Sequence, residues 1–347
     1  MKYTRKEIDK TGKVLLTAVD PEKYKQAIEK LNDWRSLHLV PLDKLQQKIV
    51  DFLDFNNIRA FLISRRLKRL TSIQYKLDLN PEMRLGGMQD IGGLRVVVNT
   101  VEELLRLQSL LHSLSISDFE CRRMYDYVNE PKESGYRSIH FSYIYHCADT
   151  DYDGLRIELQ IRTRLQHLWA TAVETAGLYT KTSLKSSQGN AEWLEFFKVV
   201  SSLFCYKEHL PVARNLRNMT MKALMLECYA RNKHYRYSDI LKALNVSVHE
   251  TEDKTRDYSY YLIFINFVNS TVKVTPFKKN EEKLASEKYT ELESHLQDDK
   301  NAAVLVAVSK IEELRQAYPS YFLDTKEFTS NIDKICQNCI DWNLLSK

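Results

Sequence analysis

The sequence predicts an α+β fold in which helices pack on a mixed β-sheet. Residues 155–162 read Leu-Arg-Ile-Glu-Leu-Gln-Ile-Arg, which alternates apolar and polar side chains with the period of a half-buried strand. Before it, strand-like and helix-like stretches alternate, and the last three strands follow one another through turns. This order is typical of a mixed sheet flanked by helices.

The first part of the chain supplies most of these elements. Apolar residues at helical spacing predict two helices over 21–56, broken near Val40-Pro41. Thr163 is a candidate N-cap for a helix that directly follows the alternating strand. We expect, in order, strand 58–67, helix 71–78, a glycine-rich loop 80–92, strand 93–98, helix 101–114, strand 116–125, a polar loop 126–137, strands 138–147 and 154–162, and helix 163–179.

The last third of the chain predicts a second, smaller α/β unit. Residues 258–268 are dense in aromatic and β-branched side chains, and Asn269-Ser270 forms a turn into a second strand, which predicts a hairpin. We expect one domain over 1–232 and another over 233–347. The remaining elements are a loop at 181–190, helices at 191–208, 211–232, 279–297, 309–317 and 324–337, and a strand at 302–308.

Composition is that of an ordinary globular protein. The chain has 347 residues, 44% hydrophobic and 28% charged, with no apolar run of transmembrane length and no signal-peptide pattern, so we expect a cytoplasmic protein without membrane contact. Six cysteines include one closely spaced pair, Cys336 and Cys339, without a second pair to complete a zinc site, so reduced thiols are expected.

Charge is unevenly distributed. The net charge of +5 excludes a general polyanion binder, but residues 59–76 contain six Lys and Arg residues and no acid. That patch suggests phosphate binding, although a solvated face would give the same pattern. No Gly-x-x-x-x-Gly-Lys-Ser/Thr motif occurs, so any bound triphosphate would depend on side-chain cations. Arg66, Lys68 and Lys76 are the candidates.

Two carboxylates complete a candidate magnesium–nucleotide site. Asp90 stands just before Gly92-Gly93, where the backbone permits close approach of a ligand, and is a candidate Mg²⁺ ligand. Glu158 is a second candidate ligand, or the base that activates an attacking hydroxyl. Tyr136, beside Gly135, is free to stack on a base. A half-buried sheet without function would also produce the alternation around Glu158.

Four motifs in order resemble the RelA/SpoT synthetase family over roughly residues 45–180. They are Ser64-Arg65-Arg66-Leu67-Lys68 with Ser72-Ile73 and Lys76, Asp90-Ile-Gly-Gly-Leu-Arg95-Val, Ser134-Gly-Tyr-Arg-Ser-Ile-His140, and Glu158-Leu-Gln-Ile-Arg-Thr163 with Trp169-Ala170 and Glu174.

The resemblance implies the RelA/SpoT pyrophosphotransferase fold and the transfer of pyrophosphate from ATP to a ribose hydroxyl. It implies ATP binding by Arg66, Lys68, Lys76 and Arg95, with Mg²⁺ on Asp90 and Glu158, which are also the catalytic pair. On the acceptor side it implies Tyr136, stacked on the acceptor base, together with Arg137, His140, Gln160, Arg162 and His167.

The chain departs from the family pattern on the acceptor side. Glu174 is followed by Thr175 where the family often has histidine, and His167 takes a place where an amide is common. The acceptor therefore need not be GDP or GTP. No His-Asp metal pair precedes the synthetase motifs, so a product hydrolase is not expected.

The C-terminal third is similar to that of CapRel-type fused toxin–antitoxin proteins of phage defence. This resemblance implies a pseudo-zinc-finger-like domain that inhibits pyrophosphorylation of the 3′ CCA end of tRNA until a phage capsid-type protein binds. Tyr318 and Tyr321 would block the adenine site, although a helix end with packed aromatics would look the same. The alternatives are a (p)ppGpp synthetase acting on GDP or GTP and a partner-sensing module with weak catalysis. A monomer is favoured.

Overall fold

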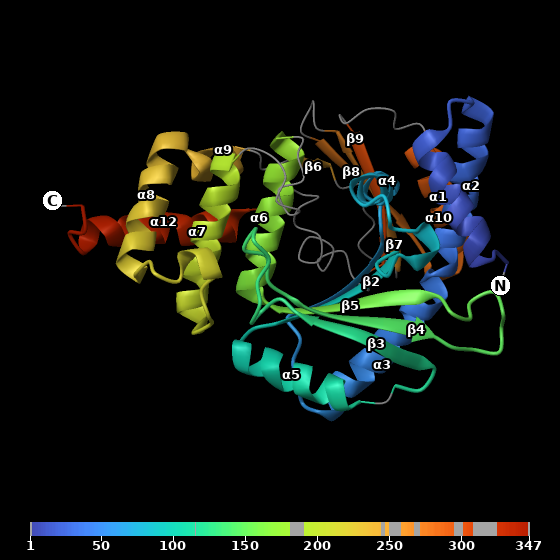
Figure 1. The fold of residues 1–347 in the computed structure, drawn as a ribbon, viewed down its shortest axis with the longest axis horizontal. Helices are drawn as coiled ribbons and strands as arrows, with labels where there is room; N and C mark the ends of the chain where they lie inside the picture. Colours follow the sequence, from blue (N-terminus) through green and yellow to red (C-terminus); the bar gives the residue numbers. More distant parts are fainter. Residues whose placement is uncertain are drawn as a thin grey trace.

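A computed structural model describes residues 2–114, 116–180, 191–243, 247–249, 258–266, 271–294, 301–307 and 325–345. Within these ranges, nine strands form one mixed sheet in the order β3-β4-β5-β2-β1-β9-β7-β8-β6, with helices packed around it (Figure 1). The predicted α+β class with a mixed sheet is confirmed.

The first half of the sheet comes from the region with the synthetase-like motifs. Its strands are β1 (Leu62–Leu67), β2 (Gly92–Val98), β3 (Phe119–Asp126), β4 (Ile139–Tyr145) and β5 (Arg156–Thr163). Strand β2 is parallel to β5, whereas β1–β2, β3–β4 and β4–β5 are antiparallel pairs. Each strand lies within a few residues of its predicted range.

One face of these strands forms the main hydrophobic core. Helices α3 (Leu39–Phe55) and α5 (Val101–Ser113) cover it, and Leu45 and Leu104 pack there with Val96 and Leu159, all fully buried. At about 25 cal/mol per Å² of apolar surface, each such side chain contributes about 1.5–3 kcal/mol. The polar positions of β2 and β5 therefore point to the opposite face.

The N-terminal helices are α1 (Arg5–Thr17), α2 (Pro21–Leu37) and α3, with α4 (Leu70–Leu79) beside them. The break between α2 and α3 falls at His38 rather than at the predicted Val40-Pro41. Pro41 lies in the first turn of α3, where its missing N–H is not needed. The sequence prediction missed α1, although Thr4 and Glu7 form the capping box that marks its start.

The C-terminal strands extend the same sheet. They are β6 (Ser247–His249), β7 (Tyr260–Asn266), β8 (Thr271–Phe277) and β9 (Asn301–Ala307), and β9 pairs antiparallel with β1. Helix α10 (Glu282–Ser294) packs on β7 and β9 and reaches α2. The sheet thus continues past the boundary expected at 232/233, which falls inside α8, and the division into two domains stays a prediction.

The remaining helices form a bundle at the end of the molecule where the C-terminus lies (Figure 1). They are α6 (Arg164–Thr180), α7 (Ala191–Glu208), α8 (Met221–Tyr235), α9 (Tyr237–Ala243) and α12 (Lys326–Asp341). Phe328 and Ile332 of α12 are buried against α7 and α8. The predicted helix 211–232 begins only at 221, after the Thr220 N-cap. The predicted elements at 181–190 and 309–317, and Tyr318 and Tyr321, lie outside the described residues.

Two general expectations can be compared with this structure. All six cysteines are free thiols. Among the described residues, none of the helices combines the length and hydropathy needed to cross a bilayer.

Candidate active site

Strand register brings the predicted site residues onto one face of the sheet. Glu158 on β5 lies opposite Gly93 on β2, and Gly93 lies opposite Arg66 on β1. Residues opposite each other on neighbouring strands share a face. In the adjacent row, His140, Gln160, Arg95 and Ser64 follow one another across β4, β5, β2 and β1.

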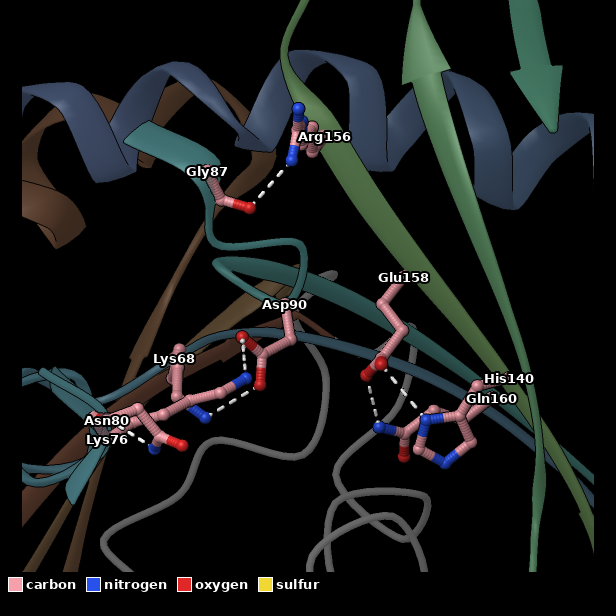
Figure 2. Close-up of polar contacts among 9 residues, drawn as sticks. All are labelled: Lys68, Lys76, Asn80, Gly87, Asp90, His140, Arg156, Glu158 and Gln160. Atoms are coloured by element: carbon pink, nitrogen blue, oxygen red, sulfur yellow. Dashed lines mark hydrogen bonds and ion pairs between the residues drawn. The ribbon is translucent and has the colours of Figure 1, made fainter. Parts of the chain in front are cut away.

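Asp90 is at the centre of the donor half of the site. It lies in the loop before β2, and its two oxygens accept from the Nζ of Lys68 at 2.8 Å and the Nζ of Lys76 at 3.0 Å (Figure 2). Lys68 follows β1, and Lys76 is carried by α4. Burial opposes ionisation of Asp90, but the two lysines outweigh it and hold the pKa of Asp90 well below its usual range.

The lysines are held in an electropositive environment. Burial is the largest effect on Lys68 and lowers its pKa, and the positive charges of Lys76 and Arg66 act in the same direction. Arg95 likewise contributes to lowering the pKa of Arg162. Several cations are therefore gathered beside one carboxylate, and an arriving polyphosphate would relieve their mutual repulsion.

Glu158 is at the centre of the other half of the site. His140 Nδ1 lies 3.0 Å from Glu158 Oε1, Gln160 donates to Oε2, and the hydroxyl of Tyr136 lies 2.9 Å from His140 Nε2. Burial disfavours the imidazolium, yet Tyr136 and Glu158 outweigh it and raise the pKa of His140 to about 9. In turn, His140 overcomes burial and lowers the pKa of Glu158. At neutral pH this is an imidazolium–carboxylate pair.

Gly93 lies near both halves of the site. Among the described residues, a Cβ built on Gly93 would meet only the backbone oxygen of Arg66, at 3.9 Å. Glu158 lies directly opposite Gly93, and Asp90 precedes Gly93 by three residues in the loop before β2. Asp90 and Glu158 are near enough to each other for the charge of Asp90 to oppose ionisation of Glu158 (Figure 2). A glycine here lets a ligand approach the strand backbone near the two carboxylates.

Arg162 and His167 form a buried pair at the end of β5. Arg162 donates to Nδ1 of His167, and both side chains are almost completely buried. Burial lowers the pKa of Arg162 to about 9, with Arg95 contributing in the same direction. This arginine lies at the end of the same face as Glu158 and Gln160, as the sequence predicted.

Two predicted acceptor residues are placed differently. Tyr136 is only 2% exposed, and its ring packs against Tyr127, His140 and Trp169, so here it is not free to stack on a base. Arg137 is buried and donates to the backbone oxygens of Val128 and Pro211, outside the cluster around Glu158.

The sequence prediction missed an aromatic row beside His140. Tyr125 and Tyr127 are stacked with ring centroids 5.9 Å apart, and the Nζ of Lys132 lies 4.6 Å from the Tyr127 centroid. Arg123 donates to the hydroxyl of Tyr125. Tyr125 lies opposite His140 in the β3–β4 register, so this row continues the site face. The period-two spacing of Arg123, Tyr125 and Tyr127 was the available sequence signal.

Part of the chain is similar in sequence to known proteins. Residues 65–183 match the family model described as "Region found in RelA / SpoT proteins". The chain is 30% identical over 146 residues to GTP pyrophosphokinase rsh of Brucella melitensis, covering 42% of this chain and 18% of the relative. It is 30% identical over 151 residues to GTP pyrophosphokinase YjbM of Bacillus subtilis, covering 43% and 66%.

A solved structure is also similar to part of the chain. The crystal structure of small alarmone synthetase 1 from Bacillus subtilis covers 52% of this chain and 93% of its own, with 23% identity and a TM-score of 0.44. The chain spans about a fifth of the length of the first curated relative. Residues 65–183 therefore match the region found in RelA/SpoT proteins, the family that the sequence motifs resemble.

Proposed function

We propose that this chain is an ATP-dependent pyrophosphokinase that transfers the terminal diphosphate of ATP to a ribose hydroxyl and releases AMP. One observation carries the proposal: two carboxylates, Asp90 and Glu158, lie within electrostatic reach of each other, with two lysines on the first and His140 on the second. Pyrophosphate transfer depends mainly on positioning and on cations around the phosphates, which this arrangement would supply.

The two carboxylates fit a Mg²⁺ ion that arrives with the nucleotide. Mg²⁺ usually takes one or two carboxylates from a protein and completes its coordination with phosphate oxygens and water. Asp90 and Glu158 are both held as anions, one by Lys68 and Lys76 and the other by His140. When bound, the ion would neutralise negative charge that develops on the phosphates.

We expect the phosphates of ATP to replace Asp90 as the ionic partner of the two lysines. Lys68 and Lys76 each contact one oxygen of Asp90 and can turn to a phosphate oxygen without leaving the site. Arg66, in the row of Glu158 and Gly93, and Arg95, in the row of Gln160, would bind further phosphate oxygens.

In the transfer step, the acceptor hydroxyl oxygen forms a bond to the β-phosphorus of ATP. The bond from that phosphorus to the oxygen bridging the α-phosphate breaks, and AMP leaves with the electron pair. The hydroxyl proton passes to Glu158 and then to solvent. Because His140 lowers the pKa of Glu158, this carboxylate is a weak base, which suits a loose transition state that needs little prior deprotonation.

The acceptor we propose is the 3′ CCA end of tRNA. In support, Arg123 and Tyr125 are exposed on edge strand β3 and continue the site face beyond His140. Cations interleaved with aromatic rings are typical of surfaces that bind single-stranded nucleic acid. A mononucleotide acceptor would not extend along this row.

GDP or GTP is the second candidate acceptor. Its support is the identity of 30%, over 146 and 151 residues, to proteins named GTP pyrophosphokinases. For a mononucleotide acceptor, Tyr136 would have to turn away from Trp169 to expose its ring.

The C-terminal segment is proposed to inhibit transfer through Tyr318 and Tyr321 until a phage capsid-type protein binds. In support, β9 ends at Ala307 opposite Arg65, next to the donor residue Arg66, and Tyr318 follows eleven residues later in the sequence. A segment of that length can span the donor side of the site.

The test uses the full-length chain, γ-labelled ATP, Mg²⁺, and either tRNA or GDP/GTP, with wild type and Tyr321→Ala compared. Label on tRNA that is absent when the 3′ ribose has been oxidised with periodate supports the tRNA proposal. Label on guanosine nucleotides alone replaces it with the second candidate. Equal rates for wild type and Tyr321→Ala would remove the tyrosines from inhibition, and no label in any combination would reject the pyrophosphokinase proposal.

A further inference from the structure

A buried network links helix α10, from the last third of the chain, to the segment that carries the two donor lysines. Arg35 of α2 is 1% exposed and donates through Nη1 to Oε2 of Glu293 at 2.8 Å and through Nη2 to the hydroxyl of Tyr289 at 2.7 Å. Tyr289 in turn donates to Oε1 of Glu293 at 2.7 Å. The three side chains therefore connect two helices more than 250 residues apart in sequence.

The same network holds the backbone next to Lys68. Nη2 of Arg35 donates to the carbonyl oxygen of Lys68 at 2.7 Å, and Oε1 of Glu293 accepts from the backbone N–H of Leu70 at 2.9 Å. The chain between these two contacts is the junction from β1 to α4. Arg35 therefore binds a backbone carbonyl of this junction, and Glu293 binds a backbone N–H of it.

Glu293 supplies the cap that α4 lacks. Arg69, the N-cap residue of α4, makes no side-chain capping hydrogen bond. The first N–H groups of a helix have no partner within the helix, and a carboxylate there also interacts favourably with the helix dipole. Glu293 provides both interactions to Leu70, from a different part of the chain.

Both lysines that contact Asp90 belong to this junction or to the helix that follows it. Lys68 contributes the carbonyl that Arg35 holds, and its side chain reaches Asp90. Lys76 reaches Asp90 from α4, the helix that Glu293 caps. A shift at the start of α4 would move Lys76 relative to Lys68, and an error of about 1 Å in such a site can cost about 100-fold in rate.

We infer that Glu293 is a positioning residue for the donor site, through which docking of α10 on α2 sets the affinity for the ATP phosphates. This inference rests on the proposed function. It makes the C-terminal segment necessary for donor binding, in addition to any inhibition by Tyr318 and Tyr321. A partner that moved α10 away from α2 would weaken ATP binding.

The test compares full-length Glu293→Ala, Glu293→Gln and the matched control Glu287→Gln, an exposed acid on the same helix. Binding of a fluorescent ATP analogue with Mg²⁺ gives donor affinity, and steady-state kinetics give separate KM values for ATP and acceptor. Amide hydrogen exchange of residues 68–79 is measured without nucleotide. It reports the junction itself and does not depend on activity.

We expect Glu293→Ala to raise the Kd and KM for ATP by about tenfold or more, because it removes a buried charged partner of Arg35 and Leu70. The acceptor KM should change by less than about threefold, since its residues lie on other strands. Exchange of 68–79 should be faster. Glu293→Gln, which retains an acceptor oxygen for Leu70, should lie between Glu293→Ala and wild type, and Glu287→Gln should match wild type.

Unchanged ATP affinity together with unchanged exchange in Glu293→Ala would overturn the inference. Equal losses for ATP and acceptor would also overturn it, because they would indicate general destabilisation. If Glu293→Ala does not fold, Tyr289→Phe removes a single hydroxyl from the network and gives the same comparison. If wild type binds no ATP, the proposed function fails, and the exchange measurement still decides whether Glu293 holds the start of α4.

Discussion

Replacing Asp90 by Asn tests the centre of the proposed donor site. The change removes one negative charge and keeps the shape of the side chain. In the wild type, Asp90 is 19% exposed and contacts both Lys68 and Lys76 within 3.0 Å. The variant leaves two ammonium groups facing each other in a largely buried place, and burial already lowers the pKa of Lys68.

The magnitude follows from these contacts. Removing one partner of a buried ion pair costs about 3–5 kcal/mol. Lys76 is 34% exposed and can turn toward water, and Lys68 can lose its proton, so we expect the free energy of unfolding to fall by about 1–3 kcal/mol. Transfer should fall by at least about 1,000-fold, or about 4 kcal/mol in activation free energy, because the carboxylate proposed to bind Mg²⁺ is gone.

The affinity for ATP without Mg²⁺ should not fall in Asp90→Asn, in contrast to the transfer rate. Without Mg²⁺, the phosphates of ATP compete with Asp90 for the two lysines, so Asp90→Asn should bind ATP as tightly as wild type or more tightly. Equilibrium dialysis with labelled ATP, with and without Mg²⁺, measures this difference beside the transfer rate. Asp78→Asn, an exposed acid on α4, is the matched control.

Two results would refute this reasoning. Transfer by Asp90→Asn within about tenfold of wild type would remove Asp90 from the mechanism. Loss of ATP binding in the absence of Mg²⁺ would mean that Asp90 does not compete with phosphate for the lysines. Either result counts only if the Asp90→Asn protein is folded to the same extent as the Asp78→Asn control.

Three further predictions concern other parts of the structure. Gly93→Ala should leave the melting temperature within a few degrees of wild type and reduce transfer by about tenfold or more. The reason is that the added methyl group would come no closer than 3.9 Å to any atom of the described residues but would project into the proposed ligand space. Unchanged kinetics would show that no ligand approaches there. Burial lowers the pKa of His38 to about 4, so its contribution to stability is present above pH 6.5 and is lost as the pH falls toward 4. Wild type should lose about 3 kcal/mol over that range relative to His38→Asn in urea titrations, and parallel curves would contradict this. Removal of residues beyond 235 should give aggregated protein, because it exposes the core that Phe328 covers and the edge of β1 that pairs with β9. A fragment that is monodisperse in sedimentation and unfolds cooperatively on heating would contradict this prediction.

Much of the site could be predicted from the sequence because its residues lie on regular strands. The alternation at 155–162 fixes which side chains share a face, and β5 shows it, with Glu158 and Gln160 partly exposed between buried apolar neighbours. The glycine pair at the start of β2 and the cations at and after the end of β1 were likewise visible as local patterns. The period of a strand places Glu158 and Gln160 on one face. Bringing Arg66 and Gly93 beside them depends on how the strands pair.

The network around Arg35 could not be predicted, because it joins residues from distant parts of the chain. An arginine inside α2 and a glutamate inside α10 look like ordinary exposed charges of amphipathic helices. Their burial follows from the pairing of β9 with β1, which brings α10 against α2. Tyr136 was misjudged for a similar reason, since Trp169 that covers it comes from α6.

The most direct test of the proposed function is the stoichiometry of the reaction in full-length protein. Wild type and Tyr321→Ala would be incubated with ATP, Mg²⁺ and either tRNA or GTP, and AMP would be quantified by chromatography while the acceptor is weighed by mass spectrometry. We predict one AMP released for each acceptor that gains a diphosphate group on its ribose, with no product from Glu158→Gln. Release of ADP or inorganic phosphate without a change in acceptor mass, or no AMP from either protein with either acceptor, would contradict the proposed function.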